Sequence, residues 1–386
     1  MNCEPNIYST VVYDIGSAMI RVGHAGEGFP VISQPSFVAN KTVDENIEFY
    51  YNDQFLYTTS NKYEVAPLID ESYTISDAGL FSSFLSWSYD QLSVDPRERF
   101  CLFTQPAHLV STDHSRQWQK TLCEIGFEAM GNPGICISPD ATLSTYAHCL
   151  QTALVVDFGW SSFRILPVID GKVQYANAKI HPIGGFGLSQ LLCEQLNVRS
   201  ISLLPKNADI SDGQNLLHQR KLSTDIIHNC CTFAKNTIEE DFLYFLPEQR
   251  PIDVKSEMQL ISALHFNPID SDDTTENVLP VPEMIKMAID ESPDDQKRDL
   301  WKNIVSSGGF SSLNSFIAKL KNETKKIADP VFQVQVQYPM HKMVAGDFLV
   351  WTGGSILASS HVFDRFCITK EEWEENGEAI MRVKCT

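Results

Sequence analysis

The sequence is poor in basic residues, and its cysteines are not clustered. Among 386 residues, 30 lysines and arginines face 49 aspartates and glutamates, so the formal net charge is −19. Such a charge repels phosphate backbones, which argues against a general nucleic-acid binder and predicts no sequence-specific nucleic-acid contact. The ten cysteines form no C-x-x-C pair, whereas a structural zinc site needs clustered ligands. We therefore predict no structural metal.

Long apolar runs are also missing. No segment approaches the ~20 apolar residues that a membrane-spanning helix needs. The first residues, MNCEPNIYSTVV, lack the basic segment and apolar core of a secretory signal. We expect an intracellular protein with reduced thiols and no membrane contact. An apolar content of 43% and a length of 386 residues are sufficient for two domains, each with its own core.

One strand–turn–strand pattern occurs twice, about 140 residues apart. The first copy is TVVYDIG followed by MIRVGHAG, and the second is ALVVDFG followed by FRILPV. In each copy the glycine allows close approach, and backbone N–H groups of the turn can point at a phosphate. A later pair, Gly308 and Gly309, precedes a helical segment. Together these elements predict the two-lobed α/β nucleotide-binding fold shared by sugar kinases, heat-shock 70 chaperones and actins.

The apolar periodicity and the turn residues predict further elements. Helical patterns cover residues 77–92, 113–131 and 140–151, and the second of these ends at a glycine. The segment 203–222 is predicted to be a loop. Near the C-terminus, the segment FLVWTGGS is predicted to be a strand that ends in a glycine turn.

On these motifs the chain resembles actin and the actin-related proteins over nearly its whole length. DIGSAMIRVGHAGEGFP and VVDFG look like the two phosphate loops, and IVSSGGFSSLNSFIAKL looks like the adenosine loop with its helix. WTGGSILASSHVFDRFCITKEEWEENG is close to the C-terminal actin signature. The DIGS loop with Arg21, and the segment GGFSSLNSF, are most similar to the nuclear actin-related protein 4 class. Other divergent actin-related proteins, including those at the dynactin pointed end, remain open.

The resemblance implies the domain organisation. It predicts an α/β, actin-like fold with two lobes and duplicated mixed sheets. The small lobe is expected to comprise residues 1–147 plus 344–386, with an insert at residues 37–65. The large lobe is expected to comprise residues 148–343, of which 191–262 form an outer subdomain.

The resemblance also implies a nucleotide site between the lobes, with ATP as the ligand. Arg21 takes the position of a cation that reaches toward the phosphates, Lys235 is a candidate ribose contact, and Phe310 could cover the nucleotide. The expected nucleotide-binding residues are Asp14, Gly16, Ser17, Ala18, Met19, Arg21, Asp157, Gly159, Lys235, Gly308, Gly309 and Phe310.

Several positions depart from the pattern of an actin ATPase. The resemblance aligns Trp160 with a second acidic residue near the metal. It aligns Asp140 with the glutamine that orients the attacking water, and Arg164 with a histidine that orders the same water. Phosphoryl transfer depends on positioning and charge stabilisation, so we expect ATP to be bound without significant hydrolysis and assign no catalytic residue. Mg²⁺ binding stays open, because this ion is usually held by only one or two carboxylates. On the adenosine side, Leu313 replaces a tyrosine and Asp347 replaces a lysine, so a cleft without nucleotide, filled in part by Trp160, is the alternative to bound ATP.

A hydrophobic cleft for a partner helix is the last implication of the resemblance. In the nuclear class, this groove takes a long basic helicase-SANT-associated helix of a remodeller or acetyltransferase scaffold, shared with a neighbouring actin. The acidic charge of this chain suits such a helix. The cleft residues are expected to be Tyr146, Ala147, Ile356, Leu357 and Phe363.

The expected function follows from these implications. We predict a non-catalytic structural subunit of a nuclear chromatin-remodelling or histone-modifying complex. Its candidate partners are actin, the scaffold helix, other subunits and histones. The alternative is a cytoplasmic actin-related protein of the cytoskeleton, at the dynactin pointed end or capping a filament. A slow ATPase of the actin type is a third reading.

Overall fold

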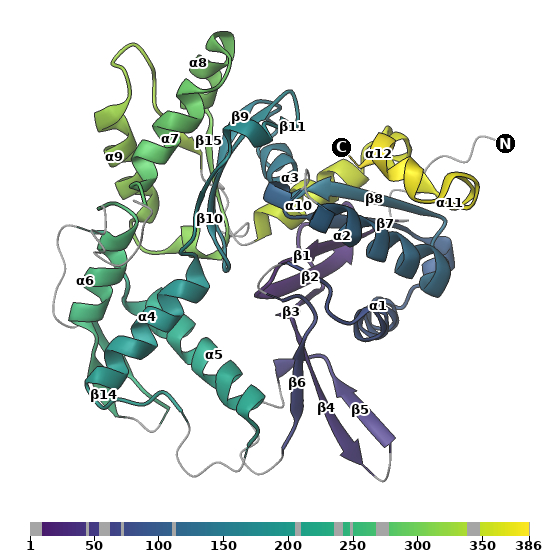
Figure 1. Cartoon of the computed structure of the whole chain (residues 1–386), viewed down its shortest axis with the longest axis horizontal. Helices are drawn as coiled ribbons and strands as arrows, with labels where there is room; N and C mark the ends of the chain where they lie inside the picture. Colours follow the sequence, from purple (N-terminus) through teal and green to yellow (C-terminus); the bar gives the residue numbers. More distant parts are fainter. Residues whose placement is uncertain are drawn as a thin grey trace.

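The computed structural model consists of two lobes, each built on a mixed β-sheet (Figure 1). This confirms the predicted fold class and its duplicated sheets. The structure describes residues 10–43, 46–53, 62–70, 73–109, 113–204, 210–234, 242–247, 250–267, 278–337 and 348–385.

The small-lobe sheet has the strand order β17-β8-β7-β1-β2-β3. β1 pairs antiparallel with β2 and parallel with β7, which pairs parallel with β8. Every residue of β1 is buried, as expected for a central strand that is covered on both faces. The strand bounds are β1 (Thr10–Ile15), β2 (Met19–His24), β3 (Ile32–Pro35), β7 (Phe100–Gln105), β8 (Gly134–Pro139) and β17 (Ile368–Thr369).

The large-lobe sheet repeats this arrangement with the order β11-β10-β9-β15-β16. β9 pairs antiparallel with β10 and parallel with β15, and β9 is also fully buried. The pair β9–β10 therefore corresponds to β1–β2. The strand bounds are β9 (Ala153–Phe158), β10 (Phe163–Ile169), β11 (Lys172–Val173), β12 (Lys179–His181), which pairs with β10, β15 (Ile304–Ser307) and β16 (Val336–Gln337).

Helices surround both sheets (Figure 1). Among the described residues, no helix is both long and apolar enough to cross a membrane. The helix bounds are α1 (Ala78–Leu92), α2 (Asp113–Glu124), which continues as a π-helix (Ile125–Met130), α3 (Asp140–Tyr146), α4 (Gly185–Val198), α5 (Asp212–Cys230), α6 (Lys255–Leu264), α7 (Val281–Asp290), α8 (Asp294–Lys302), α9 (Phe316–Ile327), α10 (Leu349–Ala358), α11 (Lys370–Asn376) and α12 (Met381–Lys384).

Two small sheets extend the lobes. The insert of the small lobe is a three-stranded sheet of the order β5-β4-β6, with bounds β4 (Phe37–Val43), β5 (Asn46–Tyr50) and β6 (Glu64–Pro67). In the large lobe, β13 (Leu243–Phe245) pairs with β14 (Pro251–Asp253). The insert sheet and α5 lie side by side at the open end of the molecule (Figure 1).

Helix α5 corrects the prediction of a loop at residues 203–222. Within that segment, the helix already begins at Asp212. Its start is a capping box, in which Ser211 and Gln214 satisfy each other's backbone N–H groups. Apolar and polar residues of α5 do not separate clearly onto two faces. A prediction based on apolar periodicity therefore missed this helix.

Helix α10 corrects the prediction of a strand and a glycine turn at FLVWTGGS. The two glycines lie inside the helix, where a side chain would collide with neighbours. A Cβ at Gly353 would lie 1.8 Å from the carbonyl oxygen of Leu143, and one at Gly354 would lie 2.9 Å from Cγ1 of Val12. The glycines therefore allow α10 to approach α3 and β1 closely.

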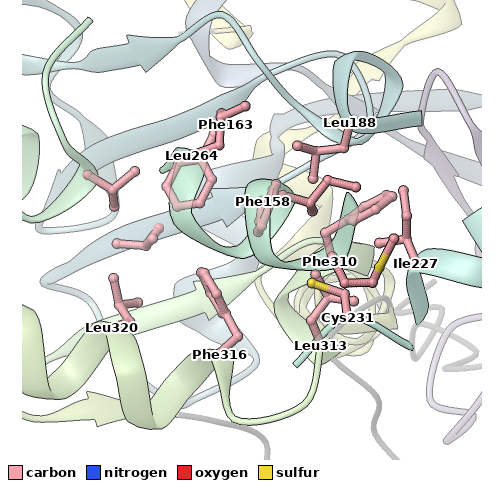
Figure 2. Packing of buried hydrophobic residues seen from close by; sticks show 14 of the residues in the cluster. Phe158, Phe163, Leu188, Ile227, Cys231, Leu264, Phe310, Leu313, Phe316 and Leu320 are labelled. Atoms are coloured by element: carbon pink, nitrogen blue, oxygen red, sulfur yellow. The ribbon is translucent and has the colours of Figure 1, made fainter. Parts of the chain in front are cut away.

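The core of the large lobe packs directly behind the second phosphate loop (Figure 2). Phe158, at the end of β9, contacts the rings of Phe163, Phe310 and Phe316 at centroid distances of 4.7, 5.5 and 5.3 Å. Leu313 is buried in the same cluster. A tightly packed aromatic core thus holds the end of β9 in place.

Candidate functional site

A cavity of about 630 Å³ lies between the two sheets, at the carboxyl ends of β1 and β9. This volume is in the range of small-molecule and cofactor sites. Lys235 is outside the described residues. The other residues predicted to bind nucleotide all line the cavity: Asp14, Gly16, Ser17, Ala18, Met19, Arg21, Asp157, Gly159, Gly308, Gly309 and Phe310.

The first phosphate loop is a tight turn between β1 and β2. The N–H of Gly16 donates to the carbonyl of Met19 at 3.1 Å, and the hydroxyl of Ser36 donates to the carbonyl of Gly16 at 2.5 Å. At its start, the N–H of Ile15 donates to Oγ1 of Thr104 at 2.7 Å. The turn is therefore held by β7 and by the residue that links β3 to β4, before any ligand binds.

The second phosphate loop is anchored to the start of α4. The carbonyl of Gly159 accepts from the N–H of Gly185 at 3.0 Å, and that of Trp160 accepts from the N–H of Phe186 at 2.7 Å. The indole of Trp160 lines the cavity and packs against Phe186 and Phe310, with centroid distances of 6.0 and 6.2 Å. Trp160 thus forms part of the wall, and it leaves the cavity open.

Arg164 forms the electrostatic centre of the site. It lies opposite Asp157 in the β9–β10 ladder, and its side chain is only 6% exposed. Nε donates to Oδ2 of Asp157 at 2.9 Å, and Nη2 donates to Oδ2 of Asp140 at 2.8 Å. Nη1 lies 3.1 Å from Nδ1 of His108. Burial opposes the charge of Arg164, but Asp140 and Asp157 hold the pKa of Arg164 well above its ordinary value.

Asp140 is fixed from both sides. Its Oδ1 accepts from the backbone N–H groups of Ala107 at 2.9 Å and Ala141 at 2.7 Å, while its Oδ2 faces Arg164. Asp140 stands where the resemblance places a neutral glutamine, so an unpaired carboxylate here would repel a terminal phosphate. The structure instead places it in an ion pair, so its charge is compensated locally.

Asp14 and Arg21 form a second ion pair beside the first loop. Nη1 of Arg21 lies 3.3 Å from Oδ2 of Asp14, and its guanidinium lies 5.3 Å from the ring centroid of Phe348. Burial raises the pKa of Asp14 to about 6, although Arg21 acts in the opposite direction. Arg21 is therefore positioned at the cavity by a carboxylate and an aromatic ring.

One face of α5 supplies cavity residues that sequence reasoning missed. Leu217, Arg220, Lys221, Thr224 and His228 all line the cavity, and they recur at helical spacing. This spacing is the signal that could have found them, had residues 212–222 been predicted as helix. Arg220 contacts aromatic rings of both lobes. Its guanidinium lies 5.6 Å from the ring centroid of Trp160 in the large lobe and 5.3 Å from that of Phe37 in the insert.

The five predicted partner-cleft residues come from the C-terminal parts of α3 and α10 and from the segments that follow. Phe363 is only 3% exposed and belongs to the core beneath α10. Tyr146 and Leu357 are partly buried against that core, and Ala147 is partly buried nearby. Ile356 is 45% exposed. Among these five residues, the accessible apolar surface therefore centres on Ile356, whereas Phe363 belongs to the core.

Two sheets of equivalent topology with a cavity between their paired hairpin turns define an actin-like nucleotide-binding fold. The sequence profile described as Actin matches residues 6–386, so the chain belongs to the actin family. Among curated proteins it is similar to Actin-related protein 4 of Oryza sativa subsp. japonica, with 24% identity over 443 aligned residues. Actin-related protein 4 of Arabidopsis thaliana is also 24% identical, over 445. In both comparisons the alignment covers 98% of this chain and 98% of the relative.

The family generally binds ATP, and the cavity fits such a ligand. A Cβ at Gly309 would meet no atom within 4 Å, so this glycine borders open space in the cavity. Gly308 has a φ of +89°, and a Cβ there would lie 2.4 Å from the carbonyl oxygen of Phe158. The adenosine loop therefore keeps a glycine-lined cradle.

The magnesium ion that accompanies the nucleotide in this family would compete with Arg164 for the carboxylates beside the second phosphate loop. Such an ion is held through carboxylates with free oxygens. Here the oxygens of Asp140 are engaged by Arg164 and backbone N–H groups, and Oδ2 of Asp157 is engaged by Arg164. Within the described part of the chain, no group of three or more His, Cys, Asp or Glu side chains is arranged to hold a metal.

Proposed function

We propose that this protein is a non-catalytic structural subunit that retains ATP without significant hydrolysis. The observation that carries the proposal is the engagement of Asp140, at the position of the water-orienting glutamine, by two backbone N–H groups and Arg164. A group locked in this way has no free oxygen with which to orient an attacking water. Since phosphoryl transfer depends on such positioning, the site holds nucleotide and does not cleave it.

The residues that would hold ATP are those of the three loops around the cavity. Backbone N–H groups of the first loop and the guanidinium of Arg21 would face the phosphates. Gly308 and Gly309 would lie against the nucleotide, and His228 on α5, which lines the cavity, is a candidate contact for the sugar. Bound nucleotide would stabilise the closed arrangement of the lobes by linkage.

Phosphate release and nucleotide extraction test this part of the proposal. The purified full chain is incubated with ATP and Mg²⁺, with skeletal actin as the positive control. We expect no phosphate release above that of the buffer, together with intact ATP recovered from the gel-filtered protein. Sustained magnesium-dependent turnover would contradict the proposal and support the slow actin-type ATPase.

We assign the subunit to a nuclear chromatin-remodelling or histone-modifying complex. Similarity to Actin-related protein 4 over the full chain supports this, as do the surface around Ile356 and the net charge of −19, which favours a basic helix. The expected partners are actin, a helicase-SANT-associated helix and further subunits, with histones as candidates. The competing assignment is a cytoplasmic protein of the cytoskeleton.

Binding of a synthetic helicase-SANT-associated helix in the presence of actin tests the assignment. Ile356→Asp places a charge on the exposed part of α10 and is expected to weaken binding by about tenfold or more. Val198→Asp is the matched control, because Val198 is 82% exposed on the end of α4, in the other lobe. Pelleting with ATP, or stable association with dynactin subunits in place of the helix, would favour the cytoskeletal alternative.

A further inference from the structure

The side chain of Arg164 lies where a cation associated with the phosphates would bind. Arg164 uses Nε and both Nη atoms toward Asp157, Asp140 and His108, so at least four of its five N–H groups are directed at neighbours. These neighbours come from three separate elements: β9, α3 and the segment at residues 107–109. The guanidinium is therefore a permanent positive charge fixed at the floor of the cavity.

His108 stays neutral beside Arg164, and Arg164 itself stays charged. Burial and the charge of Arg164 lower the pKa of His108 to about 3, so the imidazole stays neutral beside the guanidinium at physiological pH. Arginine does not lose its proton in proteins, so the positive charge persists at every accessible pH. A divalent ion at Oδ2 of either carboxylate would have to displace Arg164, and it would place a second cation beside a buried guanidinium.

The opposite wall adds a second fixed cation. Arg21 is held at the cavity by Asp14, and the two guanidinium groups belong to different lobes, on β2 and β10. Together they face the space between the two phosphate loops from both sides. The N–H groups of Arg164 are directed at its protein neighbours, so Arg164 fills the place of a metal, and Arg21 is the guanidinium that can face the phosphate oxygens.

We infer that this site binds a nucleoside triphosphate or diphosphate free of divalent cation, with Arg164 in the place of that cation and Arg21 facing the phosphates. The inference rests on the proposed function, because it concerns the form of the nucleotide that the subunit retains. Arg164 would then have two effects: it engages Asp140, which prevents hydrolysis, and it favours nucleotide without a bound metal ion.

Nucleotide affinity with and without metal tests the inference on the wild-type protein. ATP binding to the full chain is measured by titration calorimetry, once in buffer with Mg²⁺ and once with excess EDTA. The two dissociation constants are expected to agree within about twofold, because no ion bridges the carboxylates to the phosphates. An affinity lower by about tenfold or more in EDTA would overturn the inference while leaving ATP retention intact. Failure to bind in both solutions would overturn both proposals.

A direct metal measurement gives a readout independent of affinity. The protein–ATP complex is formed with Mn²⁺, gel-filtered, and examined by electron paramagnetic resonance. We expect no Mn²⁺ signal to travel with the protein, and a stoichiometric signal would contradict the inference. In Arg164→His, removal of the fixed cation frees the carboxylates, so Mn²⁺ retention is expected to appear. Arg164→Lys is the matched control, since it keeps a positive charge and is expected to retain no Mn²⁺.

Discussion

The hydroxyl oxygens of Ser17 and Ser161 lie 2.7 Å apart, so one hydrogen bond joins the two phosphate loops across the cavity. Ser17 follows the small-lobe strand β1, and Ser161 follows the large-lobe strand β9. The loops that would hold the phosphates therefore also hold the two lobes together.

Removing this bond should loosen the contact between the lobes. Ser161→Ala is expected to lower the free energy of unfolding by about 1 kcal/mol, the net contribution of a typical hydrogen bond. The matched control is Ser162→Ala, because the buried hydroxyl of Ser162 has no partner among the residues that the structure describes. Denaturant unfolding of the nucleotide-free protein measures both values. Equal losses in the two variants would show that the Ser17–Ser161 bond does not stabilise the closed arrangement.

Much of the fold could be predicted because its signals are local. The strands at Thr10–Ile15 and Ala153–Phe158 are fully buried, apolar and followed by Asp-x-Gly turns, so periodicity and turn residues identify them. The same pattern placed Asp14, Asp157 and the glycines around one cavity. Gly353 and Gly354 misled the prediction, because glycines that mark a turn in isolation serve here for close packing of α10 on α3.

The ion pairs of the site could not be predicted from the sequence, because they depend on contacts between elements that are distant along the chain. Arg164 and Asp140 are 24 residues apart, and only the packing of α3 beside β10 brings them to 2.8 Å. The sequence indicated only an aspartate in place of a glutamine at position 140 and an arginine in place of a histidine at position 164. Neither position alone indicates that the two replacements form one ion pair.

The glycine cradle provides a test of the cavity that does not disturb the fold. In Gly309→Ala the added Cβ meets no protein atom within 4 Å, so the free energy of unfolding should change by less than about 0.5 kcal/mol. The methyl group borders the space that nucleotide would occupy, and ATP affinity should fall by about tenfold. Gly28→Ala, at an exposed position with equally open space, should change neither quantity. Unchanged ATP binding in Gly309→Ala would place the nucleotide elsewhere.

Buried histidines predict a loss of stability in mild acid. Burial lowers the pKa of His265 to about 3, and of His181 to about 4, from an ordinary value of 6.5. The unfolded chain therefore binds protons below pH 6.5 that the folded chain excludes, so stability is present above that pH and lost as the pH falls. At pH 5 each such group costs about 2 kcal/mol. Asp14, with its raised pKa, acts in the opposite direction between pH 3.8 and about 6 and offsets part of the loss.

Denaturant unfolding at several pH values isolates the contribution of His265. His265→Gln removes one titrating group, so the loss of stability between pH 7 and pH 5 should shrink by about 2 kcal/mol relative to wild type. His361→Gln is the control, because His361 is exposed to solvent. An unchanged pH dependence in His265→Gln would mean that this histidine is protonated in the folded protein.

Leu217 lines the cavity where α5 packs against the insert sheet. Its side chain is buried with Ala39 and Tyr63 of the small lobe, and the N–H of Tyr63 donates to Oε1 of Gln214 at 2.9 Å one turn earlier on α5. Leu217→Ala should therefore cost about 2 kcal/mol of unfolding free energy and speed nucleotide release. The neighbouring Leu216 is 48% exposed, so Leu216→Ala should leave both unchanged. Release is followed with a fluorescent ATP analogue chased by unlabelled ATP. Equal release rates in the two variants would locate the closure elsewhere, for example at the Ser17–Ser161 bond.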